Sequence, residues 1–307
     1  MSSYNIQDMI EKNNKIQKKK YEKIIPVILF CITTVSVLAT IGILYTLLSQ
    51  SFEFFQRVSF FEFISTANWN PYSADAEWGV FALIMGTLKI VGIAVIFAVP
   101  IGVGAAIYLS EYASDRTRRV IKPILEVLAG IPTVVYGFFA INFITPLLQG
   151  IWGEINLYNA VSPGIVVGIM IIPMITSLSE DAMSSVPNAT REASLGMGAT
   201  RLETAFKVIL PAALSGIMAS IVLGVSRAVG ETMIVSIAAG STPNASLDLT
   251  ESLQAMTAFI VQITSGDAAY GTDLYFSLFA VGMTLFIFTL LMNVISQWFT
   301  KKFKEDY

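Results

Sequence analysis

The chain has 307 residues, of which 54% are hydrophobic and only 13% are charged, and its mean hydropathy is +0.68. Because a soluble domain carries about a quarter charged residues, this composition excludes an ordinary water-exposed surface and indicates a lipid-facing one. The chain has one cysteine, Cys31, and no histidine. It therefore has no internal disulfide or cysteine metal site, and it lacks the residue that most zinc sites, catalytic triads and general bases require.

Six apolar segments are long enough to cross about 30 Å of hydrocarbon as helices. The first follows a lysine-rich polar segment and is too long for the core of a secretory signal, so we expect a retained span. Barrel strands are excluded because polar and apolar residues do not alternate. The predicted spans are Ile24–Leu48, Phe81–Leu109, Val127–Leu148, Ala160–Ser179, Ala212–Ser236 and Tyr275–Phe299.

The distribution of positive charge predicts the orientation. With both termini in the cytoplasm, 16 of the 19 Lys and Arg residues fall in cytoplasmic segments, as the positive-inside rule requires. The outer segments hold only Arg57, and Lys89 and Arg227 lie within spans. The predicted organisation is a cytoplasmic segment 1–23, a first span 24–48, an extracytoplasmic segment 49–80, a membrane core 81–299 and a cytoplasmic tail 300–307.

Two outer segments have an unusual composition. Residues 50–63 are rich in phenylalanine among polar residues, which is typical of a stretch lying along the outer headgroups. The segment Leu253–Ile263 is apolar but too short to span. It is predicted to be an interfacial helix, a re-entrant helix or a protein-docking surface.

The loop 180–211 contains signals for two short helices. Pro187 stands at a first helical position, and Gly196 or Gly198 ends that helix. Thr200 and Glu203 form a capping box that opens the second helix. The loop is therefore expected to be an ordered elbow, with Pro211 opening the next span.

The run EASLGMGATRLETAFKVILP (192–211) resembles the EAA motif of ABC-importer permeases, whose pattern is EAA-x3-G-x9-I-x-LP. Ser194 stands for the second alanine and Val208 for the isoleucine. The resemblance implies a coupling helix that seats in a separate ATPase subunit, with Glu192 making a charged contact and Gly198 allowing the turn. The residues predicted for coupling are Arg191, Glu192, Ala193, Ser194, Gly198, Leu210 and Pro211.

The chain lacks the phosphate-loop pattern G-x-x-x-x-G-K-[ST]. ATP hydrolysis is therefore expected in another chain, and we predict that this protein is a transport subunit and not an enzyme, with no cofactor.

Charged residues within the spans are costly and usually face the protein interior or a water-filled path. Arg227 and Glu231 are four residues apart, which places them on one face of a continuous helix. They predict either an anion path, in which Arg227 binds an oxyanion, or a structural ion pair, and the spacing does not choose between the two. Lys89 either snorkels toward the outer surface, which we favour, or adds positive potential to the same path.

Four segments resemble phosphate-specific transport (Pst) permeases: NWNP at 68–71, the segments 86–113 and 125–139, and SRAVGETM at 226–233. NWNP and the preceding Phe-rich stretch resemble the PstC-type subunit. The resemblance implies an all-α, type I ABC importer (MetI-like) permease fold with six transmembrane helices. It also implies a PstA-type permease partner, a dimeric ATP-binding subunit, an extracytoplasmic phosphate-binding protein, and phosphate passage by alternating access near Arg227 and Glu231.

Three other functions make different demands on the sequence. The charges alone do not distinguish phosphate from another oxyanion such as sulfate or molybdate. A stand-alone channel or secondary transporter would have no need of the elbow. An intramembrane protease is excluded, because the predicted spans contain no aspartate and the chain has no histidine.

Overall fold

The computed structural model describes the backbone of residues 6–302 and the side chains of residues 24–298 apart from 267 and 296. The side chains of the terminal lysines that support the predicted orientation, at 12–23 and 301–304, lie outside the described residues. The helices, with η marking a turn of π-helix, are α1 (Ile6–Arg57), α2 (Phe60–Ser65), α3 (Phe81–Ile107), η1 (Tyr108–Tyr112), α4 (Asp115–Ala129), α5 (Thr133–Phe139), η2 (Ala140–Ile144), α6 (Thr145–Ile151), α7 (Val161–Ser184), α8 (Asn188–Gly196), α9 (Arg201–Thr204), η3 (Ala205–Ile209), α10 (Leu210–Ala212), α11 (Leu214–Val229), α12 (Met233–Ala238), α13 (Met256–Gln262), η4 (Ile263–Asp267) and α14 (Asp273–Lys302).

Five helical segments are long and apolar enough to cross a membrane, and a bent pair makes up to six. The number agrees with the six predicted spans, although no membrane is present. The five are Ile24–Arg57, Phe81–Tyr112, Thr133–Ile151, Val161–Ser184 and Asp273–Ile295, and the pair Arg201–Ala212 and Leu214–Val229 is bent by 72°.

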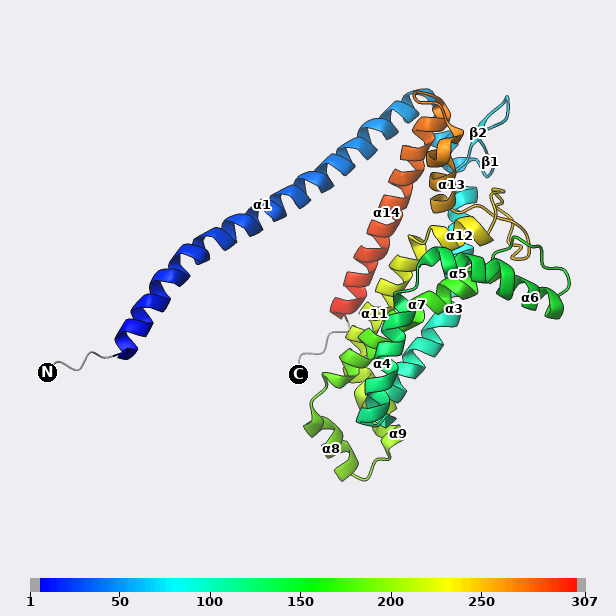
Figure 1. Cartoon of the computed structure of the whole chain (residues 1–307). Helices are drawn as coiled ribbons and strands as arrows, with labels where there is room; N and C mark the ends of the chain where they lie inside the picture. Colours follow the sequence, from blue (N-terminus) through cyan, green and yellow to red (C-terminus); the bar gives the residue numbers. More distant parts are fainter. Residues whose placement is uncertain (1–5, 303–307) are drawn as a thin grey trace.

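The two ends of the molecule carry different structures (Figure 1). At one end, called here the hairpin end, β1 (Trp69–Asn70) and β2 (Glu77–Trp78) pair antiparallel, with Trp69 opposite Trp78. At the other, the elbow end, α8 and α9 project from the body. Helix α1 diverges from the body and contacts α14.

The centre of the protein is a close pairing of α3 with α7. A Cβ added at Gly102 would lie 2.9 Å from Ile175, and one at Gly164 would lie 2.7 Å from Ile93. Small residues let membrane helices approach closely, so the two helix backbones make van der Waals contacts with each other. This pairing forms a rigid unit that runs between the two ends.

The Phe-rich stretch 50–63 is partly buried inside the protein, whereas its composition predicts that it lies along the lipid headgroups. Phe54 is fully buried and packs edge-on against Trp78, with ring centroids 5.3 Å apart, while Phe52, Phe60 and Phe61 are exposed. The helix also continues through residues 49–57, beyond the predicted end of the first span at Leu48, so the start of the predicted extracytoplasmic segment is helical. Aromatic packing at the hairpin end accounts for both differences.

The short segment Leu253–Ile263 contains α13 and lies inside the protein. Leu253, Met256 and Phe259 are fully buried, and the Phe259 ring lies 4.9 Å from the Trp69 ring. A helix buried within the chain is none of the three predicted possibilities as stated, and its burial argues against an interfacial helix and against an exposed docking surface.

Three predicted boundaries differ from the structure. Helix α4 continues to Ala129 and Pro132 then separates it from α5, so the third span begins later than Val127 because a residue before proline avoids the helical region. Helix α7 continues to Ser184, so residues 180–184 belong to it and not to the loop. The predicted fifth span is broken after Val229.

Candidate functional site

The elbow at 185–213 has the predicted helix–turn–helix form. Helix α8 starts after Pro187 and ends at Gly196, and Gly198 adopts φ +90°, in the left-handed region that favours glycine. The capping box at Thr200 is present, since the backbone N–H of Glu203 donates to Thr200 Oγ1 at 3.2 Å and Glu203 Oε2 accepts from the Thr200 N–H at 3.0 Å. These local interactions define an ordered turn between the two helices of the elbow.

The residues predicted for coupling point in different directions. Glu192 and Ala193 are exposed, as are Gly198 and Pro211. Ser194 Oγ lies 2.9 Å from Thr204 Oγ1, which joins α8 to α9. Ser194, one of the two residues that depart from the EAA pattern, therefore joins the two helices of the elbow by a hydrogen bond that alanine cannot make.

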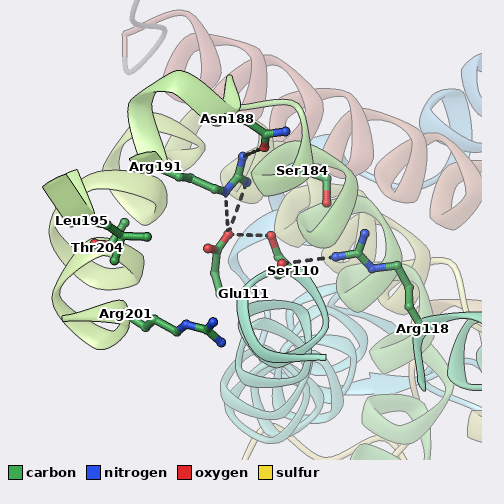
Figure 2. A pocket seen from close by; sticks show the side chains of 9 residues that line it. All are labelled: Ser110, Glu111, Arg118, Ser184, Asn188, Arg191, Leu195, Arg201 and Thr204. Atoms are coloured by element: carbon green, nitrogen blue, oxygen red, sulfur yellow. Dashed lines mark hydrogen bonds and ion pairs between the residues drawn. The ribbon is translucent and has the colours of Figure 1, made fainter. Parts of the chain in front are cut away.

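Arg191 turns toward the body of the protein. Its guanidinium donates to Glu111 Oε1 from Nε at 3.3 Å and from Nη2 at 3.2 Å, and it also donates to the carbonyl oxygens of Met183 and Val186. Figure 2 shows Arg191 reaching from α8 to Glu111 in η1. Because adjacent helical residues differ by about 100° in direction, Arg191 faces inward while Glu192 faces out.

A second ion cluster joins α7 to α4. Glu180 is 1% exposed and pairs with Arg118 Nε at 3.4 Å and with Lys122 Nζ, and its Oε1 accepts from Ser184 Oγ at 3.0 Å. Hydrogen bonding to Glu180 raises the pKa of Lys122 above its ordinary value. A buried carboxylate is tolerated when it is paired and hydrogen-bonded, so this cluster fixes α4 against α7.

An open cavity of about 490 Å³ lies between the elbow and the ends of α3 and α7 (Figure 2). Three arginines and one glutamate give it a polar, mainly cationic wall. The lining residues are Ser110, Glu111, Arg118, Ser184, Asn188, Arg191, Leu195, Arg201 and Thr204.

Arg227 and Glu231 do not share a helix face, so the predicted i, i+4 arrangement is wrong. Helix α11 ends at Val229, and Glu231 follows the break. Glu231 is 7% exposed, and its Oε1 accepts from the backbone N–H groups of Met233 at 3.1 Å and Ile234 at 3.2 Å. The Glu231 carboxylate therefore caps α12 and does not pair with Arg227.

Arg227 is exposed in the single chain, on the last turn of α11. It lines an open cavity of about 280 Å³ together with residues of α4 and α7, among them Glu126, Pro173 and Ser177. Its guanidinium therefore stands at a surface hollow where a solute or another chain has access.

Lys89 is only 8% exposed, so its side chain is buried against the loop that contains Asp248, and snorkelling to the outer surface stays a prediction. Its Nζ is 3.2 Å from the carbonyl oxygen of Asp248, to which it donates. Hydrogen bonds from Thr250 lower the pKa of the Asp248 carboxyl, which keeps a negative charge near the ammonium. Lys89 thus ties α3 to the loop at the hairpin end.

The sequence interpretation missed two acids that organise the elbow end, Glu111 and Glu180. The sequence motifs assign neither residue a role. The basic residues at 116–122 are the feature of the sequence that could have indicated them, because acidic residues at the ends of neighbouring helices are suitable ion-pair partners.

Comparison with known proteins agrees with this geometry. Residues 98–305 match the family described as "Binding-protein-dependent transport system inner membrane component". The fold is shared with a crystal structure of a bacterial ABC transporter involved in the import of alginate, at a TM-score of 0.63, 15% identity and coverage of 97% of this chain and 100% of that chain. An inward-facing structure of the MetNI methionine ABC transporter superposes at a TM-score of 0.58 with 18% identity, covering 74% of this chain and 98% of that chain.

These matches define the class: the chain is a membrane-embedded permease of the ABC-importer type. Among curated proteins, it is 34% identical to the "Phosphate transport system permease protein PstC" of Mesorhizobium japonicum, covering 78% of this chain and 77% of the relative. It is 31% identical to the protein of the same name in Haemophilus influenzae, covering 86% and 88%. The chain belongs to the PstC family of phosphate transport permeases.

Proposed function

We propose that this chain carries inorganic phosphate across the cytoplasmic membrane as one permease subunit of an ATP-driven importer. Its PstC relatives support phosphate as the solute. The observation that carries the proposal in this chain is Arg227, a guanidinium without an ion-pair partner among the described residues, exposed beside the cavity between α4, α7 and α11.

The chemistry of Arg227 suits an oxyanion. A guanidinium offers two parallel N–H donors to phosphate, and placing it at a hollow lined mainly by apolar side chains strengthens that interaction. Glu231 takes a supporting part, because its carboxylate caps α12 directly after the helix that carries Arg227.

We propose three protein partners, each for a different exposed part of the chain. Glu192 is exposed on α8 and would contact a groove in a separate ATP-binding subunit. That subunit would hydrolyse the ATP, and this chain would act only in transport. The exposed apolar surface of α1 and the hollow at Arg227 leave room for a second, homologous permease subunit. An extracytoplasmic phosphate-binding protein would dock at the hairpin end.

The test replaces Arg227 and measures uptake. In cells that express the complete importer, we expect Arg227→Gln to abolish uptake of radioactive phosphate while the subunits still co-purify. The matched control is Arg116→Gln, which removes an exposed guanidinium on α4, outside the spans. Normal phosphate uptake by Arg227→Gln would remove this residue from the path.

The identity of the oxyanion is tested separately. In the wild-type importer, we expect unlabelled phosphate to compete with labelled phosphate, and sulfate and molybdate to compete weakly. Stronger competition by sulfate or molybdate would assign the permease to that anion, with the proposed mechanism retained.

A further inference from the structure

Helix α8 has little apolar attachment to the rest of the chain. None of its residues is buried, and the cavity of about 490 Å³ separates the elbow from the ends of α3 and α7. A helix that receives force from a partner must pass it on through whatever contacts it does make. Those contacts are polar.

Arg191 supplies every side-chain hydrogen bond from α8 to η1 and α7 among the described residues. It binds Glu111 through two nitrogens and the Met183 carbonyl at 2.6 Å. The Arg191 side chain is 17% exposed and that of Glu111 is 10% exposed. Shielding from water strengthens a charge-assisted pair of this kind.

Glu111 is itself held in place. It lies in the π-helical turn η1 at the end of α3, and its Oε1 accepts from Ser110 Oγ at 2.8 Å. Arg118 Nη2 donates to the carbonyl oxygens of Leu109 at 2.8 Å and Ser110 at 3.2 Å. Arg118 also pairs with the buried Glu180, so the turn is fastened to α4 and α7 as well.

Helix α3 runs from this turn to the helix break near Glu231. Its 27 residues span about 40 Å at 1.5 Å per residue. At its far end Thr87 Oγ1 accepts from the Met256 N–H at 3.1 Å, and the neighbouring Thr257 Oγ1 donates to the Glu231 carbonyl oxygen at 2.8 Å. One continuous helix, with Pro100 in its interior, therefore links the elbow to the break that follows Arg227.

We propose that Glu111 and Arg191 are positioning residues that form a clamp, through which movement of α8 is transmitted along α3 to the helix break. In this view Arg191 is not a contact for the ATP-binding subunit, although Glu192 beside it is. The proposal rests on the importer function above, and it adds the route by which ATP-driven movement reaches the path.

The test measures the number of phosphate ions transported per ATP hydrolysed by the complete importer in proteoliposomes with its binding protein. We expect Glu111→Gln to lower this ratio by at least about fivefold, the low end of usual coupling energies, while ATP hydrolysis and co-purification of the subunits persist. Glu111→Gln leaves the bonds from Arg191 to backbone carbonyls in place, so the fold is expected to survive. Asp115→Asn, which neutralises an exposed carboxylate four residues away, is the matched control and should keep the wild-type ratio.

A double-mutant cycle separates a clamp from two independent contacts. We expect Glu111→Gln combined with Arg191→Gln to be no worse than Arg191→Gln alone, because both remove the same link. A wild-type ratio in Glu111→Gln, additive losses in the double variant, or loss of subunit assembly in Glu111→Gln would each overturn the proposal. Failure of the wild-type complex to take up phosphate would instead count against the proposed function.

Discussion

Among single residues, Glu231 shows how a carboxyl group is accommodated inside a membrane protein with no ion pair to another described residue. Its carboxylate accepts two backbone N–H groups at the start of α12, and those groups would otherwise be unsatisfied where the helix is broken. A hydrogen bond from Thr257 satisfies its carbonyl oxygen. The residue thus stabilises the break that follows Arg227.

Glu231→Ala removes the acceptor for both N–H groups. We expect it to lower the stability of the purified importer by about 0.5–2 kcal/mol, as loss of a helix cap does, and to lower its thermal unfolding midpoint. Glu231→Gln keeps a side-chain oxygen and should lose less. Equal midpoints for Glu231→Ala and the wild type would show that the cap contributes no stability.

At the scale of elements, the elbow depends on one backbone conformation between two short helices. Gly198 lies at φ +90°, whereas Gly196 ends α8 in helical geometry, and an added Cβ would meet no atom within 4 Å at either position. The two glycines therefore differ in backbone strain and not in available space.

We expect Gly198→Ala to cost about 1–2 kcal/mol, because an L-residue resists the left-handed region. The strain should reshape the turn and reduce co-purification of the ATP-binding subunit and phosphate uptake. Gly196→Ala is the matched control and should retain both. Equal uptake by the two variants would mean that the turn tolerates a side chain at Gly198.

Across the whole molecule, the two ends differ in the kinds of side chain that they carry. The elbow end carries the shielded Arg191–Glu111 pair and the exposed Glu192. The hairpin end carries a packed aromatic cluster beside the more exposed Arg57–Asp273 pair. Helix α14 ends, and α1 begins, on the side of the molecule where the elbow lies (Figure 1). This arrangement supports the proposed orientation, with both termini and the elbow in the cytoplasm.

Cysteine labelling tests that orientation. In a Cys31→Ser background, we expect Leu247→Cys, exposed at the hairpin end, to react with a membrane-impermeant maleimide in intact cells. Arg116→Cys, on α4 at the elbow end, should react only after the membrane is permeabilised. The opposite pattern would invert the orientation and place the elbow outside the cell.

Features that depend on neighbours a few residues away could be predicted from the amino-acid sequence. Hydrophobic runs predicted the spans, and proline, glycine and capping-box signals predicted the elbow, because helix ends are set within one turn of the chain. The tertiary structure decided the features that join distant segments. Arg191 and Glu111 are 80 positions apart, and Glu231 caps α12 only because the chain breaks at Gly230 and Thr257 supports the break. Local patterns carry no information about which distant charge a side chain will meet, so the clamp and the separation of Arg227 from Glu231 emerged only when the helices were packed.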